Sequence, residues 1–251
     1  MTPRRALLLS GSIGMGHDTL AQACASTLEG DGWSTRTLDL MRLLGRGGDS
    51  AGGVVFRSML AVPGLYDAFH FAALRTGSRL TDLADRAARY QIVPRLRACM
   101  DAGQPDLVLS VFATGASAVS ELAGRYPAMS HVVFCTDVTP HRLWVHPNVD
   151  LYLVTSSVAE RAVRRFEPQA RVLVVPAPLR QGFYHPPTQT QARIRLGIPD
   201  GEPCVLLMSG AWGIGPVGQA AEALAAAGIH VLAVAGRNAR LQRQLGEAAR
   251  Q

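Results

Sequence analysis

One group of residues suited to chemistry is a glycine-rich turn near the start of the chain. It runs from Ser10 to Gly16 and is followed directly by His17. Glycines let a ligand approach the backbone closely, and the N-terminus of a following helix offers free N–H groups and partial positive charge. That charge disfavours imidazolium, so the His17 ring should be neutral and able to take a proton from an acceptor hydroxyl. We interpret His17 as a candidate general base; a capping or solvent-exposed histidine is the alternative.

A second group of such residues lies in one short stretch after an apolar segment. Asp137, His141, Trp144 and His146 fall within ten residues, and side chains of these types are poor material for a core. Asp137 could orient a histidine base or bind an acceptor hydroxyl, and Trp144 could stack on a sugar or cover the site. A metal site made by the carboxylate and the two imidazoles is an alternative, but the spacing fits no zinc template, and we expect no bound metal. A helix-capping loop is the structural alternative.

The glycine turn occurs twice in the sequence. The pattern from Leu7 to Gly16 reappears from Leu206 to Gly215, and an alanine-rich helical pattern follows each copy. A repeated strand–loop–helix unit indicates two facing Rossmann-like domains with a cleft between them. Neither copy is a Walker A motif, because lysine is absent, and neither is a full dinucleotide fingerprint. Asp39 lies near the distance at which that fingerprint has its acidic residue, so an NAD(P)-binding Rossmann protein remains an alternative.

The elements that would position these groups alternate along the chain. Short apolar runs bounded by turn residues predict buried strands at 6–9, 106–112, 131–136, 151–155 and 171–175, and again at 204–208 and 229–235. Helical patterns lie between them at 19–29, 79–102, 115–124 and 158–166, and later at 216–227 and 239–249. This alternation predicts an α/β fold with a parallel sheet that has helices on both faces.

Four prolines between Pro176 and Pro187 mark a loop that divides the chain. We expect an N-terminal Rossmann-like domain over residues 1–178, a linker over 179–202 and the first βαβα part of a second Rossmann-like domain over 203–251. Two strands and two helices cannot make a stable α/β domain alone, because their sheet would expose most of its apolar face. We therefore expect an incomplete second domain; a short C-terminal appendage is the alternative.

Composition narrows the classes of partner. The chain has 251 residues and a net charge of +6, and all 25 of its basic residues are arginines. A basic surface favours anionic partners such as phosphates and acidic lipid headgroups, and no basic stripe interleaved with aromatics indicates nucleic acid. The four cysteines are far apart in sequence, which predicts buried thiols in a reducing cytosol.

Any contact with a membrane is expected to be peripheral. The apolar run that ends at Leu9 is too short for a signal peptide, and no apolar stretch reaches the roughly 20 residues that span a bilayer. Large apolar side chains and arginines crowd into residues 54–76, around Pro63 and Gly64. That segment could lie in the interface of an anionic membrane, or it could pack on the sheet as an ordinary helical excursion.

Together these motifs resemble the monogalactosyldiacylglycerol synthase-like glycosyltransferases and their diacylglycerol glucosyltransferase relatives, which are of the glycosyltransferase family 28 type. Residues 10–21 are similar to the glycine-rich GxGH opening of the family, and residues 63–66 resemble its P-x-L-Y element. Residues 136–150 resemble its TD…H..W.HP.VD signature, which is the most specific match. Residues 176–183 and 236–241 resemble its linker and its donor-domain G-R-N-x-x-L run, although Ala177 stands where the linker usually has glycine.

The resemblance implies a GT-B fold whose first domain binds a lipid acceptor at a membrane and whose second domain binds a UDP-sugar. It implies an inverting hexosyltransferase of glycolipid synthesis that needs no cofactor and acts by direct displacement, and we expect it in the cytoplasm, peripheral at the inner face of the membrane. The site residues implied by the resemblance are the catalytic His17, Asp137 and His141, the acceptor-binding Gly14, Gly16, Tyr66, Trp144 and His146, and the donor-binding Gly213, Gly215, Arg237 and Asn238.

Two questions stay open in the sequence. The later donor residues of the family would lie beyond Gln251, so we expect the chain as it stands to be inactive. A catalytically dead lipid-binding or membrane-binding module is therefore an alternative to the enzyme. Glucose, galactose and N-acetylglucosamine are all compatible with the sequence as the transferred sugar, and so are diacylglycerol, a polyprenyl lipid or a soluble aglycone as its acceptor.

Overall fold

The computed structural model describes residues 3–12, 15–43 and 79–249, and the chain divides into two compact units, Met1–Arg180 and Gln181–Gln251. The first unit holds the first glycine turn, and the second unit holds its repeat. Gly14, Tyr66 and the whole of the segment 54–76 lie outside the described residues.

The first unit is built on a six-stranded sheet whose strand pairs are all parallel, in the order β2-β1-β3-β4-β5-β6. Because every strand runs the same way, the carboxyl ends of all six strands lie along one edge. Most strands are short apolar runs, as a buried parallel sheet requires, whereas the edge strand β2 (STRTLD) is largely polar and partly exposed. The strands are β1 (Arg5–Ser10), β2 (Ser34–Asp39), β3 (Leu107–Ser110), β4 (Ser130–Phe134), β5 (Leu151–Val154) and β6 (Val172–Val174).

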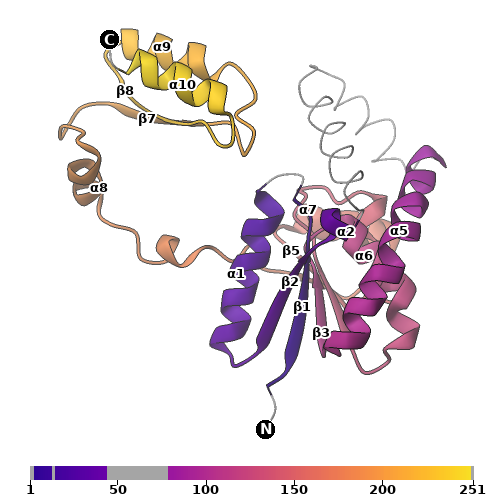
Figure 1. Cartoon of the computed structure of the whole chain (residues 1–251). Coiled ribbons are helices and arrows are strands. Elements are labelled where there is room, and N and C mark those ends of the chain that lie inside the picture. The colour runs from indigo at the N-terminus through magenta and orange to yellow at the C-terminus, as the bar shows by residue number, and fades with distance from the viewer. Residues whose placement is uncertain (1–2, 13–14, 44–78, 250–251) are drawn as a thin grey trace. The chain divides into compact units, whose positions relative to one another are not determined.

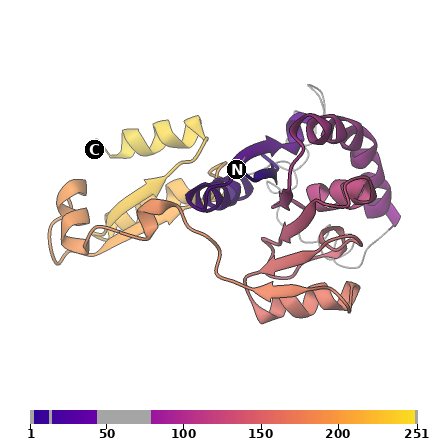
Figure 2. The same cartoon turned by 90° about the horizontal axis from the view of Figure 1, so that it is seen from below.

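Helices cover both faces of this sheet, as Figures 1 and 2 show. Helix α1 (Gly16–Gly30) lies on one face, whereas α5 (Arg79–Gly103) and α6 (Ala113–Leu122) lie on the other. A short helix, α2 (Leu40–Leu43), follows β2, and α7 (Ser157–Phe166) connects β5 to β6. The side chain of Ser156 caps α7 by accepting a hydrogen bond from the amide of Ala159 at 3.2 Å.

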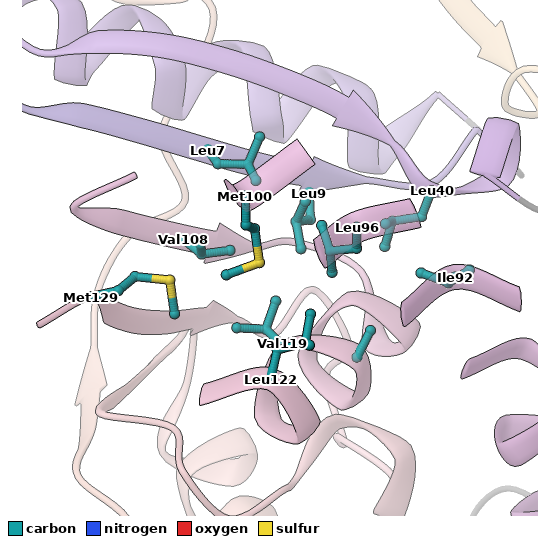
Figure 3. Close-up of a cluster of buried hydrophobic side chains, with 11 residues drawn as sticks. Leu7, Leu9, Leu40, Ile92, Leu96, Met100, Val108, Val119, Leu122 and Met129 are labelled. Carbon is teal, nitrogen blue, oxygen red and sulfur yellow. The ribbon is translucent and has the colours of Figure 1, made fainter. Parts of the chain in front are cut away.

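Separate apolar cores hold the helices to the sheet. Alternate residues of β1 point to opposite faces, so Leu8 packs under α1 whereas Leu7 and Leu9 pack under α5 and α6. Figure 3 shows the core on the α5 side, where Leu96 and Met100 meet the sheet. A third cluster lies around Trp144, between α7, the end of β4 and the turn η3 (Arg142–Trp144). The glycine turn is thus attached to a strand that is buried from both sides.

The described part of the second unit contains a two-stranded parallel sheet, three α-helices and the short 3-10 helix η4 (Gln181–Phe183). Its elements are α8 (Gln189–Leu196), β7 (Cys204–Met208), α9 (Val217–Ala226), β8 (His230–Val234) and α10 (Ala239–Ala248). Leu206 and Met208 are 56% and 68% exposed, so one face of this small sheet is open to solvent in the described structure. That exposure is what the sequence led us to expect of two strands alone.

Most elements lie where the sequence predicted them, and β7 matches residue for residue. One difference is α8, which falls inside the expected linker. Thr188 and Gln191 form a capping box at its start, and Gly197 ends it in the left-handed conformation with φ of 67°. Among the described residues, no helix is both long and apolar enough to cross a bilayer.

Candidate active site

The candidate site lies where the loops that follow β1, β3 and β4 come together at the carboxyl edge of the first sheet. From β1 the chain crosses to β2 on one side, and from β2 it returns to β3 on the other side of β1. The loops after β1 and β3 therefore diverge, which is the point where open α/β sheets usually bind ligands. His17 follows the first of these loops, and Val111 and Phe112 follow β3.

The ring of His17 is held in one tautomer. Its Nδ1 lies 2.7 Å from the carbonyl oxygen of Val111. A carbonyl oxygen can only accept a hydrogen bond, so Nδ1 carries the proton and donates it. In the neutral ring the lone pair is then on Nε2. His17 is half-buried in the first turn of α1, so a proton-accepting nitrogen is fixed at the edge of the sheet where a ligand would lie.

Two aromatic rings flank His17. The ring of Phe112 meets it edge-on, with centroids 5.1 Å apart and planes inclined by 71°. The indole of Trp144 lies 6.4 Å away at an inclination of 39°. Phe112 also explains the first glycine of the turn, because a Cβ at Gly11 would lie 2.7 Å from the Phe112 ring. Gly11 therefore makes room for an aromatic side chain that contacts the candidate base.

Asp137 is connected to this arrangement through Trp144. The indole Nε1–H of Trp144 donates to Oδ2 of Asp137 at 2.9 Å, and Nε2 of His141 lies 3.4 Å from the same oxygen. The Trp144 side chain is only 2% exposed and belongs to the third core cluster. The expectation that Trp144 stacks on a sugar does not fit this burial, because an indole inside the core has no face open to a ligand. In the structure, the buried indole of Trp144 lies beside the His17 ring as a fixed neighbour.

His146 is engaged within its own loop. Its Nε2 donates to the carbonyl oxygen of Leu143 at 2.7 Å, and its backbone N–H and carbonyl both bond the hydroxyl of Tyr152. Burial lowers the pKa of His146 from its ordinary value. In the described part of the chain, no group of three or more His, Cys, Asp or Glu side chains could hold a metal ion.

Two carboxylates hold the loop after β1 and the start of α1 in place. Oδ1 of Asp39 accepts hydrogen bonds from the amides of Ser12 and Met41, at 3.2 and 3.0 Å. The hydroxyl of Ser10 donates to Asp18 at 2.5 Å, in the first turn of α1. These contacts give Asp39 a local structural use, so its position in the sequence does not by itself support the NAD(P) alternative.

His131 was not singled out in the sequence, yet it anchors the far end of the loop that carries Asp137 and Trp144. It is 1% exposed on β4; its Nδ1 donates to the carbonyl oxygen of Asn148 at 3.2 Å, and its Nε2 lies 3.4 Å from the hydroxyl of Ser110. Asn148 has a positive φ of 60°, which is unusual for a residue with a side chain. Burial lowers the pKa of His131 to about 4. Its place at the start of an apolar strand, directly before Val132 and Val133, is a signal in the sequence that could have indicated this burial.

A pocket of about 390 Å³ lies beside the first turn of α1. Gly16 lines it, and the hydroxyl-bearing Thr19, Thr136 and Thr155 lie around it together with apolar side chains. Arg180 donates to the hydroxyl of Thr19 at 3.1 Å. Of the acceptor-binding residues implied by the resemblance that the structure describes, Gly16 lines this pocket, whereas Trp144 and His146 do not.

The second glycine turn has a different construction. A Cβ on Gly213, where φ is +56°, would lie 2.6 Å from the carbonyl oxygen of Ala235; a Cβ on Gly236, where φ is +59°, would lie 2.5 Å from that of Ala211. These two glycines let the loops after β7 and β8 pack backbone against backbone.

The remaining predicted donor residues lie around these loops. Asn238 caps α10 through the amide of Leu241 and donates to the carbonyl oxygen of Gly213 at 3.2 Å, and Arg237 lies over the Trp212 ring at 5.4 Å. A pocket of about 440 Å³ is lined by Gly213, Gly215 and Asn238. Three of the four predicted donor-binding residues therefore share one pocket in the second unit.

Comparisons with known proteins agree with the motifs. A family model described as monogalactosyldiacylglycerol (MGDG) synthase matches residues 57–175. A probable chloroplastic MGDG synthase of Glycine max is 30% identical over 158 residues, and MGDG synthase 1 of Arabidopsis thaliana is 31% identical over 158 residues. Each match covers 57% of this chain and 30% of the relative, so the chain spans less than a third of the length of these proteins.

Solved structures show weaker likenesses. MurG of Acinetobacter baumannii aligns with 98% of this chain and 63% of its own, at 12% identity and a TM-score of 0.47. A putative UDP-N-acetylglucosamine 2-epimerase of Listeria monocytogenes aligns with 97% of this chain and 66% of its own, at 12% identity and a TM-score of 0.46. The similarity to the monogalactosyldiacylglycerol synthases therefore rests on the sequence matches, in which the family model covers residues 57–175.

Proposed function

We propose that the protein is a glycosyltransferase that moves a hexosyl group from a UDP-sugar to the hydroxyl of a lipid acceptor such as diacylglycerol, with His17 as general base. The observation that carries the proposal is the fixed tautomer of His17, which leaves Nε2 as the proton-accepting atom, and the preceding residue Gly16 lines a pocket at the carboxyl edge of the sheet. The relatives support the reaction class, because their names specify synthesis of a galactosyl lipid.

The chemistry needs one base on the acceptor side. Nε2 of His17 takes the proton from the acceptor hydroxyl while that oxygen attacks the anomeric carbon of the donor. The new C–O bond forms as the bond to the UDP oxygen breaks, and UDP leaves with the electron pair, so the anomeric configuration inverts. Val111 holds Nδ1–H throughout, which lets the ring become imidazolium without turning.

The donor side requires groups that stabilise the charge on UDP as it leaves. In the second unit, Gly213 and Gly215 lie just before α9, and Asn238 is the N-cap of α10. Backbone N–H groups at helix starts are suited to phosphate oxygens, and Arg237 adds a positive charge near the same loops. We assign the UDP-sugar to this side of the protein.

A lipid acceptor implies that the protein works at a membrane surface. The net charge of +6 favours attraction to anionic headgroups, and we place the protein at the cytoplasmic face of the membrane as a peripheral enzyme. The relatives are named for the synthesis of a galactosyl lipid, which supports work at a lipid surface.

A transfer assay tests the proposal. The protein, at its full natural length, is incubated with radiolabelled UDP-galactose, UDP-glucose or UDP-N-acetylglucosamine and vesicles that contain diacylglycerol. We expect labelled glycolipid from one donor and a loss of about 100-fold or more in kcat for His17→Ala, the size expected for removing a general base. His185→Ala is the matched control, because His185 is an exposed histidine in the second unit.

Two outcomes would overturn the proposal. Unchanged turnover in His17→Ala would remove His17 from the mechanism. Vesicle binding without transfer, and without UDP-sugar affinity in calorimetry, would show instead a lipid-binding protein with no transferase activity.

A further inference from the structure

We infer that Asp137 is a positioning residue that acts on His17 through the indole of Trp144, and not a second group that exchanges protons or binds the acceptor. The inference rests on the proposed function of His17 as the base. It assigns separate tasks to two residues that the sequence placed together as catalytic candidates.

One hydrogen bond and two aromatic rings surround the His17 ring. The carbonyl oxygen of Val111 fixes Nδ1 by accepting a hydrogen bond from it, but one hydrogen bond leaves the ring free to pivot about that contact. The rings of Phe112 and Trp144 flank the imidazole at 5.1 and 6.4 Å and limit this movement. The direction in which Nε2 points is therefore set by where these two aromatic rings lie.

The rings of Phe112 and Trp144 are each held in place by their own neighbours. Phe112 lies against the backbone of Gly11, where a side chain would clash. Trp144 packs in the core beside Cys135, Val133 and Tyr152, and its one polar atom donates to Asp137 at 2.9 Å. A buried indole N–H without an acceptor is unfavourable, so Asp137 selects the indole orientation that satisfies it.

Asp137 contacts both Trp144 and His141 and is partly exposed to water. Its side chain is 34% exposed, so water reaches the carboxylate and screens its charge. The oxygen that accepts from Trp144 also lies 3.4 Å from Nε2 of His141, whose side chain is only 11% exposed. Asp137 therefore lies between the buried indole and His141, and the contact that leads towards His17 runs through the indole. Hydrogen-bond acceptance, which an uncharged amide can also supply, is enough for this task.

Two isosteric variants separate positioning from charge. Asp137→Asn keeps an acceptor oxygen and removes the charge, whereas Asp137→Leu keeps the shape and removes both. In the 251-residue protein, NMR chemical shifts of the His17 ring protons report the ring currents of Phe112 and Trp144. We expect those shifts to stay as in the wild type for Asp137→Asn and to move for Asp137→Leu. Trp144→Phe, which keeps an aromatic ring but has no N–H, should make His17 insensitive to a further Asp137→Leu change.

The transfer assay gives the matching kinetic arm. We expect kcat within about twofold of wild type for Asp137→Asn, a loss of about tenfold or more for Asp137→Leu, and little change of KM in either, because a displaced base slows the chemical step. A loss of kcat in Asp137→Asn as large as that in Asp137→Leu would show that the charge of the carboxylate is itself required. Unmoved His17 shifts in Asp137→Leu would show that no link exists. Because the NMR arm needs no turnover, it is read even if the protein transfers no sugar, so failure of the proposed function is distinguishable from failure of this inference.

Discussion

The two glycine turns share a sequence pattern but use their glycines differently. In the first unit, Gly11 makes space for the ring of Phe112, and that ring contacts His17. In the second unit, nothing lies within 4 Å of a Cβ built on Gly210, the counterpart of Gly11. Gly213, whose counterpart Gly14 lies outside the described residues, makes space for the carbonyl oxygen of Ala235, a backbone atom of the neighbouring loop. The first turn therefore builds a position for a side chain, whereas the second builds a surface of close-packed backbone.

This difference explains why the two turns are followed by different residues, His17 and Pro216. The histidine that follows the first turn needs neighbouring side chains to orient it, and the loops after β3 and β4 supply them. The second turn is followed by Pro216, the N-cap of α9, and needs no such support. A proton-transferring acceptor side and a phosphate-holding donor side would require this division.

The largest effect is expected at Gly213, where the neighbouring backbone leaves no room for a side chain. Gly213→Ala adds a Cβ 2.6 Å from a carbonyl oxygen at a φ of +56°, so both strain and a clash oppose it. We expect local destabilisation of the second unit by about 3–4 kcal/mol, measured as faster amide hydrogen exchange in β7 and β8. Gly246→Ala is the control, because nothing lies within 4 Å of that position in α10. Equal exchange in the two variants would contradict the packing described for the second turn.

A buried titrating histidine is expected to make the first unit sensitive to acid. The pKa of His131 is about 4 in the folded protein and its ordinary value is 6.5, so between these pH values the unfolded chain binds a proton that the folded chain does not. The free energy of unfolding should therefore fall as the pH is lowered from 6.5 to 4, by on the order of 3 kcal/mol from this residue.

Urea denaturation at several pH values checks this expectation. His131→Gln cannot titrate, so its stability should fall less over the same range than that of the wild type. The exposed His185→Gln is the matched control and should behave as the wild type. Parallel pH profiles for wild type and His131→Gln would contradict a buried neutral His131.

A smaller loss of stability is expected at Gly11, where the ring of Phe112 leaves no room for a side chain. Gly11→Ala adds a Cβ 2.7 Å from the ring of Phe112, which can move because it is a side chain. We expect about 2 kcal/mol of destabilisation, of the size seen for overpacking, together with displaced His17 resonances. Phe112→Leu in the Gly11→Ala background should recover part of the stability but not the His17 resonances. Gly30→Ala, in open space at the end of α1, is the control.

The smallest effect concerns a helix that both turns leave untouched. Ser156→Ala removes the cap of α7, which should cost about 1 kcal/mol of stability with no change at His17. The exposed neighbour Ser157→Ala should be nearly neutral, and thermal denaturation compares the two. A shift of the His17 resonances in Ser156→Ala would show that the site depends on more of the fold than its three loops.

Local patterns in the sequence were enough to predict every described strand except the polar β2, and most of the helices. Run length and composition place β7 and β5 within a residue, because a buried parallel strand is a short apolar run. Helix α8 was missed although its capping residues Thr188 and Gly197 were visible, since the neighbouring prolines suggested a loop.

The site was harder to predict because its contacts join loops that are far apart in sequence. Val111 and Phe112 meet His17 only because β3 lies next to β1, and strand order is not a local property. Trp144 was expected to face a ligand, but the turn η3 directs it into the core. Residue types and spacing selected His17 and Asp137 as candidates, and the strand order decided what surrounds them.

The tautomer of His17 tests the central claim most directly. Nitrogen-15 NMR of the histidine rings in the wild-type protein at neutral pH distinguishes a protonated Nδ1 from a protonated Nε2, with His17→Gln to assign the signals. Donation to Val111 predicts that His17 carries its proton on Nδ1 and has the lone pair on Nε2. A His17 ring protonated on Nε2 alone would leave no base facing the acceptor and would contradict the proposed mechanism.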